Sequence, residues 1–225
     1  KTREIVEAAI DETNYKPDIL ARNFRTRKSS TIVVLVPDIA NPFFSRVIRG
    51  IEQTAQSLGY AVLLGDTQSL RSREYTYANM VKTSQVDGII QLDCHIPFED
   101  KNDAAVPLVN ACDCVRGTDI PTVELDNAEA AETMTEHLIA SGHTNIGLIT
   151  GPVSSTITQD RLKGYKMALK NASIEFNPAN IMVGDYSIPS GILATSDLLK
   201  MQKPPSAIFC MNDEMAIGAI QQVKK

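Results

Sequence analysis

One run of six residues limits the possible folds more than any other feature of the sequence. Residues 31–36 read TIVVLV, a continuous and largely β-branched stretch without polar alternation. Such a run is typical of a parallel strand that is covered on both faces. Apolar residues then recur at helical spacing over 42–58, which predicts an amphipathic helix directly after the strand. This segment therefore predicts an α/β fold.

The alternation of strand and helix patterns continues along the chain and restarts at SGH, residues 141–143. Gly142 predicts the end of the preceding helix. We expect right-handed crossovers and two lobes with doubly wound parallel sheets, over 31–141 and 142–225. Strands are predicted at 31–36, 60–64, 86–92, 106–109, 122–125, 146–150, 181–184 and 207–211. Helices are predicted at 2–14, 42–58, 73–84, 128–141, 161–171, 191–199 and 213–224.

The two ends of the sequence suggest that it belongs to a longer chain. Residues 2–14 predict a helix with one apolar stripe and no local partner, so we expect further helices before it. The second lobe has three predicted strands, and the sequence ends directly after a helix. We therefore expect a further segment that supplies strands to both lobes.

Residues 16–30 differ in charge from the rest of the chain. Five cations and one carboxylate lie between Lys16 and Lys28, whereas residues 31–225 carry a net charge of −7. Leu20 and Phe24 lie one helical turn apart, with arginines beside them, and this pattern suits an apolar wedge in a DNA minor groove. The alternative is a solvated basic linker whose apolar side chains dock on the following domain.

Several function classes find no support in the sequence. No run approaches the ~18 apolar residues of a membrane span, and the polar first ten residues do not resemble a signal peptide. We expect a cytoplasmic protein without membrane contact. No GxGxxG, GxxxxGK[ST] or GxSxG motif is present, so we predict no phosphate cradle, no cofactor and no enzyme.

The cysteines are scattered in or beside apolar runs, which is typical of reduced thiols: Cys94, Cys112, Cys114 and Cys210. Cys94 adjoins His95, and Cys112 and Cys114 flank Asp113, both near strand ends, so a metal site has to be considered. One-residue spacings with a single nearby histidine fit no structural zinc pattern. We therefore predict no metal site.

The order of motifs along the whole chain resembles the LacI/GalR family of repressors. The resemblance rests on KTREIVEAAI at 1–10, NYKP at 14–17, LARNF at 20–24, VPDIANPFF at 36–44, VDGII at 86–90, LDN at 125–127, SGH at 141–143, GP at 151–152, RLKGY at 161–165 and NDEMA at 212–216. It implies a periplasmic-binding-protein-like core over 31–225, preceded by the last helix of a helix-turn-helix headpiece at 1–15 and a hinge at 16–30.

The resemblance also implies partners. They are operator DNA, a second copy of the chain in a homodimer, a small-molecule effector and the cyclic-AMP receptor protein. Residues 36–39, 64–66 and 96–98 are most similar to a nucleoside-responsive branch of the family, which implies cytidine as the effector. The implied DNA contacts are Tyr15, Leu20, Ala21, Arg22, Phe24 and Arg25. Phe24 departs from the leucine that is usual in the family, so an identical DNA kink does not follow.

Ligands of open α/β sheets bind beyond the carboxyl ends of the strands. The effector candidates in such segments are Phe43, Asp126, Ser155, Arg161, Tyr186 and Asn212. Phe43 could stack on a nucleobase or belong to the core, and Phe44 fits the apolar stripe better. Asp126 could accept ribose hydroxyls or only cap the following helix.

The other four candidates rest on the resemblance. Family members use the arginine at position 161 on the effector, and its planar fork suits hydroxyls and carbonyls. Ser155 and Ile157 match positions where purine-binding relatives carry polar ligands, and Ile157 departs from that pattern. Tyr186 matches an aromatic wall, and Asn212 matches a sugar contact with Asp213 as the helix cap.

An effector that favours one angle between the lobes would alter the spacing of paired hinges, which is our hypothesis for the switch. The alternatives are a purine- or sugar-responsive repressor of the same family and, from another class, a sugar-binding receptor protein. The basic hinge argues against the receptor.

Overall fold

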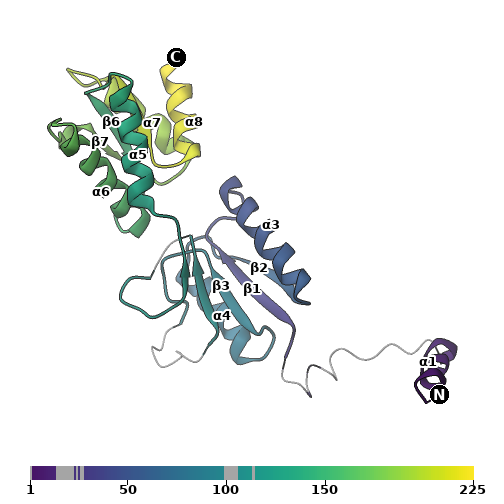
Figure 1. Cartoon of the computed structure of the whole chain (residues 1–225). Helices are drawn as coiled ribbons and strands as arrows, with labels where there is room; N and C mark the ends of the chain where they lie inside the picture. Colours follow the sequence, from purple (N-terminus) through teal and green to yellow (C-terminus); the bar gives the residue numbers. More distant parts are fainter. Residues whose placement is uncertain (1, 14–22, 24, 26–27, 99–105, 113–114) are drawn as a thin grey trace. The chain divides into compact units, whose positions relative to one another are not determined.

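The computed structural model describes residues 2–13, 23, 25, 28–98, 106–112 and 115–225 (Figure 1). The chain divides into two compact units, residues 1–123 and 124–225. The first holds a five-stranded sheet of order β2-β1-β3-β4-β5, and the second a three-stranded sheet of order β7-β6-β8. Every strand pair is parallel. The predicted α/β class with two parallel sheets is confirmed.

The first unit places residues 31–36 between two other strands of the sheet, as its second strand from one edge. Val33 and Leu35 pack in one core cluster with side chains of α4, and Val34 and Val36 pack in another with side chains of α3. Residues 31–36 are therefore covered on both faces, as predicted. The elements are α1 (Thr2–Thr13), β1 (Thr31–Val36), α3 (Pro42–Ser57), β2 (Ala61–Asp66), α4 (Arg71–Lys82), β3 (Gly88–Gln91), β4 (Leu108–Ala111) and β5 (Thr122–Val123).

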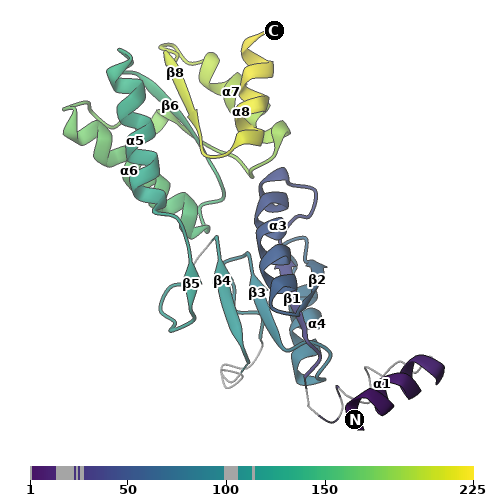
Figure 2. The same cartoon turned by 45° about the vertical axis from the view of Figure 1, so that its right-hand side comes forward.

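The second unit is built around β6, the middle strand of its sheet (Figure 2). This strand is buried along its whole length. Tyr165 packs in this core, where its hydroxyl donates to the carbonyl oxygen of Ile146 at 2.8 Å. Burial raises the pKa of Tyr165 to about 12. The elements are α5 (Asn127–Ala140), β6 (Ile146–Thr150), α6 (Thr156–Asn171), a 3-10 turn (Pro178–Asn180), β7 (Ile181–Val183), α7 (Ile188–Leu199), β8 (Ala207–Cys210) and α8 (Asp213–Val223).

The division between the units differs from the predicted boundary at 141/142. Helix α5 belongs to the second unit, where it packs against α6. The two helices meet at Gly164, because a Cβ at this position would overlap the backbone of Ala128 and Glu132. The prediction had placed α5 in the first lobe. It was wrong because strand–helix alternation does not reveal which of two sheets a connecting helix covers.

The amino-terminal predictions fall only partly on described residues. Helix α1 is present, and its apolar Ile5, Val6 and Ile10 are exposed. Asn23 and Arg25 are helical, and Arg25 is exposed. The predicted DNA contacts that lie outside the described residues are Tyr15, Leu20, Ala21, Arg22 and Phe24.

Asp87 fixes the chain where it enters the first sheet. Its carboxylate accepts the backbone N–H of Ser29 at 2.7 Å and that of Ser30 at 2.9 Å. The hydroxyl of Ser29 donates to the same carboxylate at 2.9 Å. The chain that enters β1 is therefore tied to the start of β3.

No helix in the described part of the chain has the length and apolar character needed to cross a membrane. None of the three described cysteines, Cys94, Cys112 and Cys210, forms a disulfide.

Candidate functional site

Tyr186 follows β7 at the carboxyl edge of the three-stranded sheet. Its backbone has φ of +70°, a region that L-residues other than asparagine and aspartate rarely adopt. Its hydroxyl lies 2.8 Å from Oγ1 of Thr158 and 3.3 Å from Oγ of Ser155. The ring lies so close to Gly151 that a Cβ there would overlap it. Local strain of this kind persists only where the surroundings fix the residue, and it clusters at functional sites.

Asn212 joins this tyrosine to the next loop along the sheet edge. Its Nδ2 donates to the carbonyl oxygen of Tyr186 at 2.7 Å, and its Oδ1 accepts the N–H of Met215 at 3.0 Å. Asn212 is thus the cap of α8, and Asp213 is the first residue of that helix. The prediction that Asp213 caps the helix is wrong, because the amide of Asn212 reaches the third helical N–H.

Arg161 lies in the second turn of α6, and its guanidinium is held by hydrogen bonds to two segments. Nε donates to Oδ1 of Asn127 at 2.9 Å, and Nη1 donates to the carbonyl oxygen of Met211. Asn127 is buried, and its Nδ2 donates to the carbonyl oxygen of Leu125 at 3.2 Å. Two fixed donors in one plane set the direction of the remaining N–H groups of the guanidinium.

Four helices of the second unit begin at polar caps. Each cap oxygen accepts an N–H of the first turn, and helix amino-termini carry partial positive charge that favours electron-rich ligand groups. Asp126 accepts the N–H of Glu129 at 2.9 Å and therefore caps α5, and its side chain is exposed. The caps of α5, α6, α7 and α8 are Asp126, Ser155, Ser187 and Asn212.

The loop after β7 carries one carboxylate whose charge is stabilised locally. Oδ1 of Asp185 accepts the hydroxyl of Ser187 at 2.5 Å and its N–H at 3.0 Å. Hydrogen bonds from Ser187 and Ser190 lower the pKa of Asp185. The loop therefore keeps a negative charge directly before the cap of α7.

The first unit presents Phe43 at the start of α3. The side chain is 52% exposed and contacts Phe44 edge-on, whereas Phe44 packs in the core. Asn41 caps this helix by accepting the N–H of Phe43 at 3.0 Å. Phe44 is the ring that packs in the core, as the apolar stripe predicted, and Phe43 stays a candidate for contact with a ligand.

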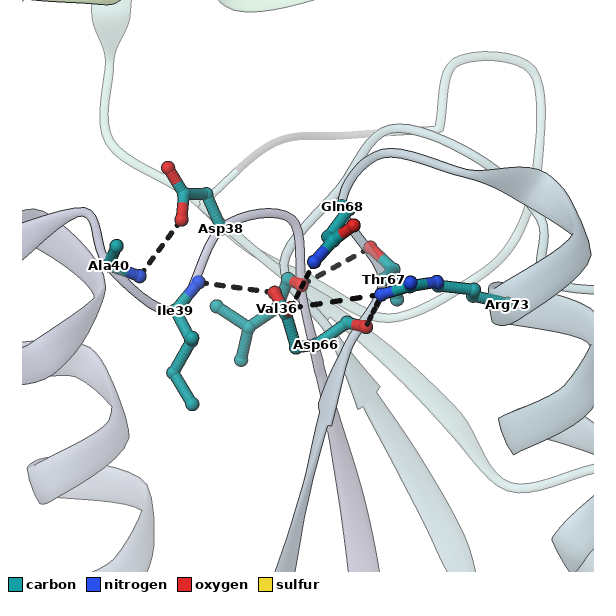
Figure 3. Close-up of polar contacts among 8 residues, drawn as sticks. All are labelled: Val36, Asp38, Ile39, Ala40, Asp66, Thr67, Gln68 and Arg73. Atoms are coloured by element: carbon teal, nitrogen blue, oxygen red, sulfur yellow. Dashed lines mark hydrogen bonds and ion pairs between the residues drawn. The ribbon is translucent and has the colours of Figure 1, made fainter.

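Asp66 ties together the loops after β1 and β2 (Figure 3). Its Oδ1 accepts a hydrogen bond from the N–H of Ile39 at 3.3 Å, and its Oδ2 accepts one from Nε2 of Gln68 at 3.1 Å. The carbonyl oxygen of Val36 accepts the N–H of Thr67 at 2.9 Å. These bonds fix the loop that leads to Phe43.

Residues 29–225 match the family described as periplasmic binding proteins and sugar binding domain of LacI family. The HTH-type transcriptional repressor CytR of Escherichia coli K12 is 39% identical over 227 residues, which span 100% of this chain and 67% of that protein. The chain belongs to the LacI/GalR family of transcriptional repressors. Catabolite control protein A of Priestia megaterium is 34% identical over 97% of this chain and 67% of its own. The crystal structure of CcpA of Lactococcus lactis superimposes with a TM-score of 0.79, at 25% identity, over 88% of this chain and 73% of that one.

In this LacI/GalR-family chain, four predicted effector residues form one connected set at the edge of the second sheet. Ser155 and Tyr186 share a contact, Tyr186 is bonded to Asn212, and Arg161 is bonded to the residue before Asn212. Asp126 precedes the Asn127 that holds Arg161. Phe43 belongs to the first unit.

Sequence reasoning about this family member missed Asn127 and Thr158. Asn127 stood beside Asp126 in a recognised motif, but a buried asparagine that orients an arginine 34 positions later leaves no periodic signal. Thr158 was assigned to a loop, because helix α6 was predicted from 161 and begins at Thr156. The signal for the earlier start was Ser155, whose hydroxyl accepts the N–H of Thr158 at 3.3 Å.

Replacing Tyr186 with phenylalanine is expected to lower the free energy of unfolding of the second unit by about 1 kcal/mol. The change removes the hydroxyl contacts with Thr158 and Ser155 and leaves the ring in place. Urea unfolding measures the effect. Tyr60→Phe in the first unit is the control. An equal loss of stability in both variants would contradict a stabilising role for the Tyr186 hydroxyl.

Proposed function

We propose that this repressor binds a nucleoside, cytidine, through residues that include the connected set at the edge of its second sheet, and that binding alters its affinity for operator DNA. One observation carries the proposal: hydrogen bonds join Ser155 to Tyr186 and Tyr186 to Asn212, and Arg161 donates to the carbonyl oxygen of Met211, the residue before Asn212. Such a network suits the hydroxyls and carbonyls of a neutral polar ligand. An exposed aromatic ring at Phe43 suits a planar base.

Calorimetric titration with cytidine, adenosine, guanine and ribose tests the proposal. We expect cytidine to bind tightly and the other three weakly. The second candidate is a purine- or sugar-responsive repressor, and tight binding of guanine or ribose alone would establish it instead. Ile157 disfavours a purine, since an apolar side chain stands where purine-binding relatives carry a polar ligand.

The hinge proposal concerns the basic segment before the first sheet. We propose that Tyr15, Leu20, Ala21, Arg22, Phe24 and Arg25 contact operator DNA, with Phe24 as the apolar wedge and the arginines on phosphates. Arg25 is exposed, as a phosphate contact requires.

Replacing Arg25 with alanine is expected to reduce the salt dependence of duplex affinity, because each phosphate contact that is lost lowers the slope of log K against log salt by about one. Titrating a duplex at several salt concentrations measures this slope. Lys170→Ala, at the exposed end of α6, is the control and should leave it unchanged. An unchanged slope in the Arg25 variant would remove this residue from the DNA contact.

The remaining assignments are parts of the same proposal. We place the repressor in the cytoplasm, as a homodimer without enzymatic activity, and name the cyclic-AMP receptor protein as its partner on DNA. The similarity to transcriptional repressors supports these assignments. Sedimentation of the protein alone and with that partner tests both associations.

A further inference from the structure

The first unit brings four polar side chains with metal-binding atoms together beyond the end of β3. Asp93, Cys94 and His95 come from the segment after this strand, and their ligand atoms lie within 4.8 Å of one another. Glu74 comes from α4. Nδ1 of His95 lies 3.5 Å from Oε1 of Glu74 and 3.6 Å from Oδ1 of Asp93.

Glu74 is unusual because it is completely buried. Neither of its carboxylate oxygens, nor Nδ1 of His95, has a hydrogen-bond partner among the described residues. Burial raises the pKa of Glu74, the charge of Asp93 raises it further, and His95 opposes both effects. A buried carboxylate without hydrogen bonds is strongly unfavourable unless a cation compensates it.

The distances within the cluster indicate what the compensating cation is. An ordinary N–H···O bond is about 2.7–3.2 Å long, so the 3.5 and 3.6 Å separations are too long for good hydrogen bonds. Two ligands that each lie about 2.0–2.2 Å from a tetrahedral ion are roughly 3.3–3.6 Å apart. The distance from Nδ1 of His95 to each carboxylate oxygen is therefore the distance expected between two ligand atoms of one ion.

We propose that Glu74, Asp93, Cys94 and His95 bind a divalent transition-metal ion, Zn²⁺ being the best match. A thiolate, an imidazole and carboxylates together form the mixed donor set that zinc accepts. The Cys94 thiol loses its proton on binding, so affinity rises with pH. His95 has a side chain that is 35% exposed, which gives the ion access from solvent. This site shares no residue with the effector candidates.

The sequence did not predict this site because only short spacings between neighbouring cysteines and histidines were considered. Glu74 lies on a helix that precedes them by about twenty positions. Only the folded sheet brings the carboxylate to the histidine, so no local motif reports it.

Calorimetric titration of the full chain with Zn²⁺ under non-chelating reducing conditions tests the proposal. We expect one ion per chain, and at least tenfold weaker binding by each of Glu74→Gln, Cys94→Ser and His95→Gln. Cys210→Ser removes a cysteine of the second unit and is the matched control, which should bind as the parent does. Circular dichroism establishes that each variant is folded.

Titration with Co²⁺ adds a spectroscopic readout. A thiolate-to-cobalt charge-transfer band should appear in the parent and in Cys210→Ser, and should be absent in Cys94→Ser. The proposal is overturned by the absence of saturable Zn²⁺ binding, or by binding that persists unchanged in the Glu74→Gln and Cys94→Ser variants. In that event Glu74 and His95 form a plain ion pair.

Discussion

Replacing Gly164 with alanine is expected to lower the free energy of unfolding of the second unit by about 3 kcal/mol. The added Cβ would overlap the carbonyl oxygen of Ala128 and the backbone nitrogen of Glu132. These are backbone atoms of α5, so no side chain can rotate away and the two helices have to separate. Thermal unfolding should show a midpoint lower by about 10 °C or more.

The matched control is Gly50→Ala in helix α3. A Cβ at Gly50 meets nothing within 4 Å, so the change adds helix propensity without a clash. We expect an increase in stability of about 0.5–1 kcal/mol. Equal behaviour of the two alanine variants would show that α5 and α6 do not pack as closely as the structure indicates.

Replacing Arg161 with alanine is expected to weaken effector binding on the order of a hundredfold. Hydrogen bonds from a charged donor contribute about 1.5–3 kcal/mol, and the guanidinium is already oriented before the ligand arrives. Arg161→Lys keeps the charge without the planar fork, so it should restore only part of the affinity. Calorimetry with cytidine measures both variants.

Two further variants separate recognition from orientation. Lys163→Ala changes an exposed cation on the same helix and should leave affinity unchanged. Asn127→Ala removes the acceptor of Nε and should weaken binding less than Arg161→Ala, with non-additive effects in the double variant. Parent-like affinity of a folded Arg161→Ala variant would end its assignment as an effector ligand.

Most of the fold could be predicted because hydrophobic periodicity is a local property. Residues 31–36 and 146–150 are strands with the predicted bounds, and Gly142 ends its helix with φ of +94°. The allocation of α5 failed because it depends on the contact between Gly164 and Ala128, which lie far apart in sequence. A packing contact between distant segments leaves no periodic pattern in the sequence.

The candidate site was predictable only in part. Strand ends selected the segments that hold Tyr186 and Asn212, since ligands of parallel sheets gather at that edge, and the family resemblance selected the two residues within them. The bonds of each residue were not predictable: Asn212 proved to be the helix cap, and Asn127 and Thr158 proved to be the partners that hold the site together. Such roles arise when loops distant in sequence meet.

The helix caps of the second unit constrain how ligand preference can change. Ser155 and Asn212 each use a side-chain oxygen to hold a helix and also belong to the candidate site. A substitution of either residue that changed ligand preference would also weaken the start of a helix. Such a substitution would need a second one that restores stability. The side chain of Phe43 is 52% exposed and does not cap a helix, because Asn41 caps α3. New specificities should therefore evolve more readily by single substitutions in the first unit than in the second.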